Sequence, residues 1–182
     1  NTNAESTATD SLTSFDTGGF TVGSSAAVNQ SGQDYVGWAW KANGGTTSSN
    51  TDGTITSTVQ VNADAGFSIA TWDGNGSSAS IGHGLGVAPD MLLVKNLDGT
   101  NSWIVRHKDF NGYLSLEQSA AGSSSDVFGT APDTTKYYFN TAAGGNGYLS
   151  GNTYVGYFFA GIDGFSKFGS YTGNGSANGP IV

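Results

Sequence analysis

The chain has 182 residues, a formal net charge of −8 with only six basic side chains, and no cysteine. This composition excludes a disulfide-stapled fold, and it argues against nucleic-acid and anionic-membrane partners because both need clustered Lys and Arg. Only 11% of the residues are charged, 12% are aromatic and 29 are Gly, which argues against a helical bundle and favours short strands joined by tight turns.

The first aromatic-rich segment is YVGWAW at residues 35–40. Alternation along a strand places one set of its side chains on the same face: Val36, Trp38 and Trp40. A later segment, YVGYFFA at residues 154–160, has the matching set Val155, Tyr157 and Phe159. We therefore expect each segment to be a strand with this aromatic face in the core.

The middle of the chain contains a predicted linker, a strand and a turn. Residues 45–54, GTTSSNTDGT, contain no aromatic or aliphatic side chain. They are all Gly, Ser, Thr, Asn or Asp, which is typical of a linker. TITSTVQV at residues 54–61 alternates and predicts an edge-like strand. The Gly-Asn-Gly sequence at residues 74–76 favours a hairpin turn over a calcium loop, because it lacks the spaced acidic ligands of an EF-hand.

The second half of the chain adds more predicted strands. MLLVKN at residues 91–96 is a continuous apolar run, which indicates a central strand. Further strands are expected at residues 102–107, 112–116, 136–140 and 147–150, separated by turn residues. No stretch keeps a helical period of 3.6 residues over three turns. The sequence therefore predicts an all-β fold, an antiparallel β-sandwich.

Two parts of the chain repeat each other. Tyr35 and Tyr154 are 119 residues apart, and the same spacing separates Phe20 from Phe139. GFSIATWDGNGS, which starts at Gly66, is similar to GFSKFGSYTGNGS, which starts 98 residues later. This periodicity predicts a tandem repeat of about 98 residues.

The predicted units are out of phase with the ends of the chain. They are the C-terminal part of a preceding unit over residues 1–44, a linker or insert over 45–65, a complete unit over 66–163 and the start of a following unit over 164–182. We expect the natural protein to continue past both ends. The partial units would carry strands that need partners, which predicts assembly by strand exchange.

Three motifs follow one another in the second half of the chain. They are GHGLGVAPDMLLVKN from Gly82, WIVRHKDF from Trp103, and YVGYFFAGIDGFSKFGSYTGNGSANGP from Tyr154. This string resembles a repeated β-rich domain of tailed-bacteriophage virion proteins of the marine and cyanophage type. The resemblance implies a structural or tail-associated protein, and it brings no catalytic residue with it.

His83 is a candidate metal ligand or general base. A metal site needs further ligands at workable spacing, but His107 is 24 residues away and the chain has no cysteine. The favoured interpretation is a histidine that bonds a backbone carbonyl at a turn before the strand at Met91. We expect no metal and no cofactor.

Hydrolytic chemistry has little support in the residues. The strained G-x-S-x-G turn of serine hydrolases does not occur. Glycoside hydrolysis needs two facing carboxylates, for which Asp109 and Glu117 form the candidate pair. The favoured interpretation of the acidic residues is turn formation and solvation.

Sugar binding is the remaining candidate activity. Trp103 is the best candidate ring, with Tyr113 and Asp109 as further ligand-binding residues. An exposed ring would stack on the apolar face of a sugar while polar groups bind its hydroxyls. The competing interpretation is that these rings belong to the core.

The leading functional hypothesis is a non-enzymatic structural module of a phage virion, in a tail, fibre or decoration component that contributes to host-surface attachment. Its expected location is the virion or the extracellular space. Its expected partners are further copies of itself in a homo-oligomer or fibre, other virion proteins and a host surface glycan, without nucleic acid or membrane insertion. Two alternatives stay open: a carbohydrate-binding module of a secreted bacterial protein, and a hydrolase that acts on surface polysaccharide.

Overall fold

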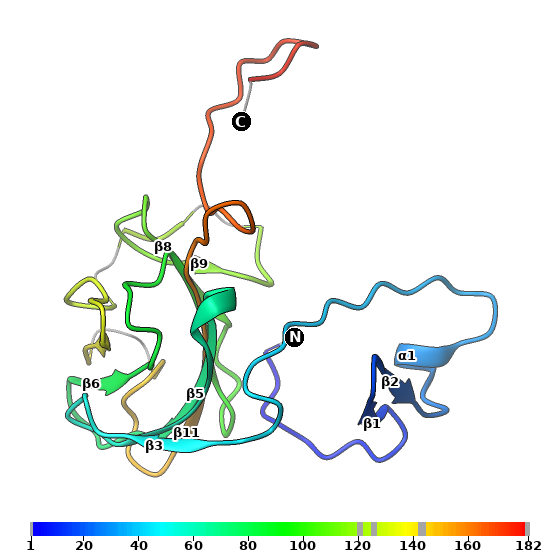
Figure 1. The fold of residues 1–182 in the computed structure, drawn as a ribbon, viewed down its shortest axis with the longest axis horizontal. Helices are drawn as coiled ribbons and strands as arrows, with labels where there is room; N and C mark the ends of the chain where they lie inside the picture. Colours follow the sequence, from blue (N-terminus) through cyan, green and yellow to red (C-terminus); the bar gives the residue numbers. More distant parts are fainter. Residues whose placement is uncertain (1, 120–121, 125–126, 142–144, 181–182) are drawn as a thin grey trace. The chain divides into compact units, whose positions relative to one another are not determined.

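The computed structural model describes residues 2–119, 122–124, 127–141 and 145–180. The chain divides into two compact units, a smaller one over residues 5–40 and a larger one that comprises residues 1–4 and 41–182 (Figure 1). Strands account for 33% of the structure and helices for 4%, and the sheets are antiparallel. The predicted all-β sandwich is therefore confirmed.

The larger unit is built on a seven-stranded antiparallel sheet. In spatial order, its strands are β3 (Ser48–Asn50), β4 (Ser57–Asn62), β5 (Phe67–Asp73), β11 (Thr153–Phe159), β7 (Met91–Asn96), β8 (Ile104–His107) and β9 (Leu114–Ser115). A short 3-10 helix, η1 (Ala63–Ala65), joins β4 to β5. The central strand β11 pairs with β5 on one side and β7 on the other, although these strands lie far apart in the sequence.

A second, two-stranded antiparallel sheet completes the sandwich. It consists of β6 (Ala79–Gly82) and β10 (Lys136–Phe139), with Tyr137 opposite Ile81. The core lies between the two sheets, where the ring of Trp72 stacks on Tyr154 at 5.6 Å and on Phe139 at 6.0 Å between centroids. Aromatic rings from both layers thus fill one common core.

Most of the strands predicted in the larger unit are present. β7 matches the prediction residue for residue, and β7, β8 and β9 form the expected antiparallel succession. β4 is not an edge strand, because β3 covers its outer side. That edge strand lies inside the predicted linker 45–54, whose Gly53 packs directly against the backbone of Ser80 and Ile81. The strand predicted at residues 147–150 is wrong, since these residues belong to no strand.

The predicted core face of β11 is wrong. Tyr154 and Phe158 are fully buried in the core, whereas Val155, Tyr157 and Phe159 point to the opposite face of the sheet. Both faces of this strand are apolar, so alternation alone does not identify the inner one. Gly156 belongs to the inner face, where it leaves room for the rings of Phe158 and Trp72.

Gly156 gives a direct test of this packing. A Cβ at this position would lie 2.7 Å from the ring of Phe158 and 3.1 Å from that of Trp72. Gly156→Ala is therefore expected to lower the free energy of unfolding by about 1–3 kcal/mol through overpacking, as measured by urea titration. Gly169→Ala, where a Cβ meets nothing within 4 Å, should change it by less than about 0.5 kcal/mol. Equal effects of the two variants would contradict the packing.

The smaller unit is a hairpin followed by a short helix. β1 (Leu12–Asp16) and β2 (Gly19–Val22) pair antiparallel, and their two-residue turn uses Gly18 at φ 84°. α1 (Ala26–Asn29) follows. A two-stranded sheet has little stability of its own.

The strand predicted at residues 35–40 is not formed. These residues belong to no strand, and the side chains of Val36 and Trp38 are 80% and 78% exposed. Their expected place in a core is therefore wrong for this structure. The physical difference from β11 is the context: β11 lies between β5 and β7, whereas the smaller unit contains only the β1–β2 hairpin.

The two similar stretches nevertheless share a tyrosine clasp. In each, the tyrosine hydroxyl accepts a hydrogen bond from the backbone N–H five residues earlier and donates one to the carbonyl nine residues earlier. The bonds are Gln30 N to Tyr35 Oη at 2.9 Å, Tyr35 Oη to Ala26 O at 2.8 Å, Leu149 N to Tyr154 Oη at 3.0 Å, and Tyr154 Oη to Gly145 O at 2.8 Å. Equivalent atoms are 119 residues apart throughout, the same offset that relates the two sequences.

The turn inside each clasp is also shared. Gln33 N donates to Gln30 O at 3.2 Å, and Asn152 N donates to Leu149 O at 3.2 Å. The glycine within the turn has a positive φ in both stretches, 76° at Gly32 and 84° in the later one. The hydrogen-bonded turn is therefore the same in both stretches, whereas residues 26–29 form a helix and residues 145–148 do not.

The clasp predicts unequal effects of the same substitution. Tyr154→Phe removes the acceptor of the part-buried Leu149 N–H and leaves Gly145 O with the Asn96 amide as its remaining donor, which is expected to cost about 1–3 kcal/mol of stability. Tyr35, at 51% exposure, is the matched control, because water can replace its hydroxyl in Tyr35→Phe. Denaturant titration of both variants provides the measurement. A Tyr154→Phe variant as stable as the wild type would contradict the burial of this clasp.

Candidate functional site

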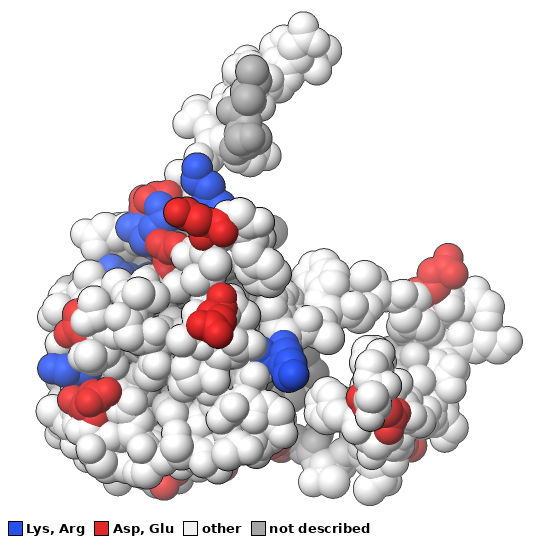
Figure 2. Space-filling model, viewed as in Figure 1, with Lys and Arg blue, Asp and Glu red and all other residues white. Residues whose placement is uncertain are grey.

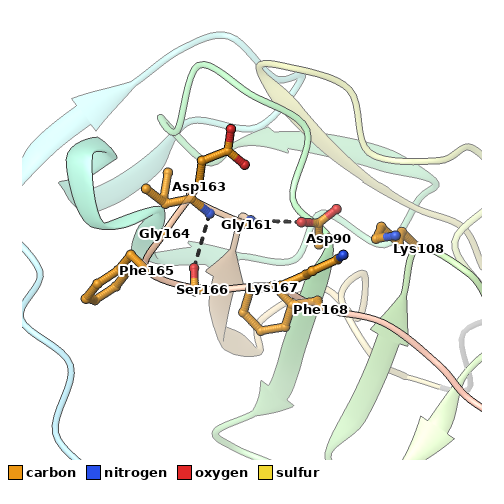
Figure 3. A pocket seen from close by; sticks show the side chains of 10 residues that line it. Asp90, Lys108, Gly161, Asp163, Gly164, Phe165, Ser166, Lys167 and Phe168 are labelled. Atoms are coloured by element: carbon orange, nitrogen blue, oxygen red, sulfur yellow. Dashed lines mark hydrogen bonds between the residues drawn. The ribbon is translucent and has the colours of Figure 1, made fainter. Parts of the chain in front are cut away.

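Charged side chains are unevenly distributed over the larger unit. Figure 2 shows few of them on most of the visible face, and a cluster of both signs at the end from which the C-terminal segment leaves. A hollow of about 520 Å³ is lined there by Asp90, Lys108 and residues 161–168 (Figure 3). Asp90 immediately precedes β7, Lys108 follows β8, and the loop follows β11.

Backbone and carboxylate bonds hold the loop of this hollow in place. Asp90 Oδ2 accepts a hydrogen bond from Gly161 N at 2.8 Å, and Asp90 N donates to Phe159 O at 2.8 Å. Within the loop, Ile162 and Ser166 exchange backbone hydrogen bonds of 3.0 and 2.9 Å. The hollow is thus a fixed feature of the ends of two central strands.

The chemistry of the hollow is mixed. Two cationic and two anionic side chains line it, so it has no strong preference for either sign of ligand charge. Figure 3 shows Lys108 and Lys167 on the same side as Asp90, whereas the ring of Phe165 points away from it. Phe168 contacts Phe159 at 6.0 Å between centroids. Aromatic rings beside charged groups suit an uncharged polar ligand such as a sugar.

The structure does not bring the predicted ligand residues together. Trp103, at the start of β8, stacks on Tyr157 at 6.1 Å and is half-buried. Asp109 lies beyond the other end of β8, where it forms an ion pair with Lys108 at 3.2 Å. Tyr113 exchanges backbone bonds with its neighbouring loop and packs against the core. The three residues therefore have separate surroundings, and none of them lines the hollow.

The carboxylate pair proposed for hydrolysis is also separated. Glu117 Oε2 accepts a hydrogen bond from Trp103 N at 3.2 Å, at the start of β8. Asp109 follows the end of the same strand. A facing pair of carboxylates, as glycoside hydrolysis requires, is not formed by these two residues.

His83 has the structural role that was expected of it. It is fully buried, its Nε2 lies 3.1 Å from Asp133 O, and its Nδ1 accepts a hydrogen bond from Leu85 N at 3.2 Å. These partners select the neutral tautomer with the proton on Nε2. Burial lowers the pKa of His83, although the carbonyl and carboxylate of Asp133 oppose this effect.

Asp133 organises the loop that meets His83. Its carboxylate accepts hydrogen bonds from Thr135 N at 2.7 Å, Lys136 N at 2.8 Å and the hydroxyl of Tyr138 at 2.7 Å. The bond from Thr135 N contributes most to holding the pKa of Asp133 well below its usual value. This loop therefore fixes the start of β10. The backbone carbonyl of Asp133 accepts the hydrogen bond from Nε2–H of His83.

These two groups predict two acid transitions in stability. Because the pKa of His83 is lower in the folded state, the unfolded state takes up a proton first, and stability should fall as pH drops below about 6.5, by up to about 1.4 kcal/mol per pH unit. The stability from Asp133 should be lost only below pH 3.8. Denaturant titrations between pH 8 and pH 3 test this, with His83→Gln as the control that removes the first decline. A wild-type curve that is flat between pH 7 and pH 5 would contradict the first assignment.

Lys95 is a buried cation that the sequence pattern did not reveal. Its side chain is 3% exposed, and Nζ donates to the backbone oxygens of Asn96 at 2.7 Å, Gly99 at 2.9 Å and Thr2 at 3.3 Å. Burial lowers its pKa. The ammonium group ties the turn after β7 to the first residues of the chain, which is a structural role.

The described residues contain neither a metal-binding cluster nor a membrane-spanning helix. Among them, no group of three or more His, Cys, Asp or Glu side chains is placed to hold a metal ion. In the part of the chain that the structure describes, no helix has the length and hydropathy of a membrane-spanning segment.

The chain matches one family model along its whole length. This model, over residues 1–182, is described as a domain of unknown function, DUF7483. No curated protein and no solved structure matches the chain. Since the family model covers the entire sequence, the chain belongs to the DUF7483 family.

Proposed function

We propose that this chain is a non-enzymatic structural module of a tailed-bacteriophage virion, a β-sandwich repeat in a tail, fibre or decoration component. It is displayed outside the particle and contributes to host-surface attachment. The motif string from Gly82 to Pro180, which resembles repeated virion domains, supports this assignment. A low-charge, cysteine-free sandwich is also suited to a durable spacer.

The tyrosine clasp is the observation that carries the proposal. Tyr35 and Tyr154 make the same two backbone bonds at the same 119-residue offset as the sequence similarity. A duplicated contact set of this kind supports copying of a whole structural unit rather than chance similarity of two apolar segments. Tandem copies of one small sandwich make extended structures, which is the proposed role.

The proposal is tested on particles of a phage that encodes this chain. Quantitative mass spectrometry of purified particles should find the chain at a copy number comparable with that of the other structural proteins. Electron microscopy with an antibody against the larger unit should label the outside of the particle. Absence from purified particles, in a lysate that contains the chain, would contradict the proposal.

A second candidate function is carbohydrate binding, as in a module of a secreted protein. The specific observation in its favour is the hollow at Asp90, with Phe168 in its wall and Phe165 at its side. Trp103 remains the candidate ring from sequence, although its half-buried position against Tyr157 leaves less of it for a ligand.

A glycan array with three variants separates these possibilities. Loss of binding in Phe168→Ala, but not in Trp103→Ala, would place the sugar in the hollow. The reverse result would place it at Trp103. Phe15→Ala is the control, because Phe15 is 84% exposed and lies in the smaller unit. Failure of the wild-type chain to bind any glycan would contradict this candidate.

A further inference from the structure

We infer that residues 35–40 of one copy of this chain pair as an antiparallel strand with residues 165–171 of a second copy, in a head-to-tail assembly. The inference rests on the proposed structural role and adds to it the two segments that make the joint. Neither segment belongs to a strand within a single copy. Ser166 exchanges backbone hydrogen bonds with Ile162, and the joint replaces these bonds with bonds to the second copy.

The larger unit contains the template for this joint. β11 pairs antiparallel with β5 along its whole length, from Tyr154 opposite Trp72 to Phe159 opposite Phe67. At the second position the two phenylalanine rings lie 5.0 Å apart between centroids. A segment equivalent to β11 should therefore pair with a segment equivalent to β5.

Residues 35–40 are the equivalent of β11. They repeat its sequence at the 119-residue offset, and the clasp of Tyr35 reproduces the clasp of Tyr154 at the beginning of the strand. The chain therefore enters both segments through the same turn and the same hydrogen bonds. What the first segment lacks is a neighbouring strand like β5.

Residues 165–171 are the equivalent of β5. Each segment follows a glycine with positive φ, 65° at Gly66 and 75° at Gly164. Each is followed by the same Asx turn, in which Asn75 Oδ1 accepts from Ser77 N at 3.0 Å and Asn174 Oδ1 from Ser176 N at 3.0 Å. Both boundaries of β5 thus recur around residues 165–171.

Large apolar side chains are exposed on both segments. Val36 and Trp38 are 80% and 78% exposed on one, and Phe165 and Tyr171 are 73% and 67% exposed on the other. Exposed apolar groups of this size are characteristic of interaction surfaces. In the template register, Trp40 lies opposite Phe165 and Tyr35 opposite Ser170, next to Tyr171, so the joint would cover aromatic side chains from both copies.

The order of the two segments selects a second copy as the partner. In the larger unit the chain passes through β5 before β11, whereas in the whole chain residues 35–40 come before residues 165–171. The β5-to-β11 order is restored by joining the C-terminal segment of one copy to the N-terminal segment of the next. Such a heterologous contact builds an open fibre, or a ring where the rotation between successive copies closes.

Light scattering over a concentration series tests whether this contact forms. The weight-average mass of the wild-type chain should rise at least twofold, because a joint of two strands is weak and depends on concentration. Ala39→Pro removes a backbone donor from the joining strand and should keep the chain monomeric. Ala8→Pro is the matched control in the same unit and should assemble like the wild type. A monomeric wild type, or assembly unchanged by Ala39→Pro, would overturn the inference.

Cysteine cross-linking tests the register and the partner, since the chain has no native cysteine. Ala39 and Ser166 correspond to the pair Phe158 and Ser68, and opposite Cα atoms in a sheet lie within disulfide range. Oxidised Ala39→Cys/Ser166→Cys should give a ladder of linked multimers, whereas either single variant should stop at dimers. Ala39→Cys/Lys167→Cys, one residue out of register, should give no ladder.

The outcomes separate this inference from the proposed function. A cross-linked monomer would overturn the second copy as the partner, and an equal ladder from the out-of-register pair would overturn the register. Absence of any cross-link would overturn the joint itself. If the chain is nevertheless found in purified particles, the structural role stands and only the strand exchange is wrong.

Discussion

Replacing Trp72 by Ala is expected to lower the free energy of unfolding by about 3–5 kcal/mol, because it removes a large ring from the centre of the core. Trp72 is 3% exposed, stacks on Tyr154 and Phe139, and donates from Nε1 to Gly147 O at 3.0 Å. Truncation therefore opens a cavity between the two sheets and leaves a carbonyl without its donor. Small domains are stable by about 5–15 kcal/mol, so the variant should be near the limit of folding.

Two further variants make the Trp72 measurement specific. Trp72→Phe keeps a ring in the core but removes the N–H donor, so its loss should be smaller than that of the alanine variant. Tyr171→Ala truncates an aromatic side chain that is 67% exposed and should change stability by less than about 0.5 kcal/mol. Denaturant titrations of dilute protein give all three values. A Trp72→Ala variant as stable as Tyr171→Ala would show that the sandwich core is misassigned.

Phe158→Ala is expected to cost about 3–5 kcal/mol, because this fully buried ring contacts Tyr137 at 5.7 Å and His83 at 5.5 Å between centroids. The neighbouring residue Tyr157 is its matched control on the other face of β11, where it is half-buried against Trp103. Tyr157→Ala should therefore cost less than Phe158→Ala.

The order of these two losses decides which face of β11 is the core face. Denaturant titration of both variants under the same conditions is the measurement. A greater loss in Tyr157→Ala would restore the face expected from the sequence and contradict the observed packing. Equal losses would indicate that the opposite face is covered as completely as the core.

Strands with a strong apolar signal could be predicted from the sequence. MLLVKN became β7 without a change of boundary, because a continuous apolar run between turn residues has few other uses. β5 was not identified as a strand by its pattern, since its inner face carries Ser68 and Ala70 beside Trp72. Small residues are needed there because the large rings fill the space between the sheets.

Tertiary context explains why the strand predicted at residues 35–40 and the core face predicted for β11 were wrong. The segment YVGWAW has the local sequence of a strand, but strand formation depends on neighbours that local sequence does not supply. In β11 the sequence is apolar on both faces, so the pattern gives no direction to the core. Both errors concern tertiary partners rather than local preference.

The candidate site was predictable only in part. The role of His83 follows from its glycine-rich setting before β7, because a lone histidine without further ligands usually serves the backbone. The hollow at Asp90 depends on three loops that are distant in the sequence, which no local motif identifies. The only signal in the sequence was the pair of phenylalanines in GFSKF at residues 164–168, within an otherwise polar segment.

The most direct test is hydrogen exchange of the backbone amides over a series of protein concentrations. It tests whether residues 35–40 are equivalent to β11 and form a strand only when they pair with a second copy. Residues 154–159 should be protected at every concentration, because they are paired on both sides. Residues 35–40 should exchange rapidly in dilute solution and become protected as the concentration rises. If they exchange equally fast at every concentration, in a sample whose mass has increased, the two segments are not equivalent strands.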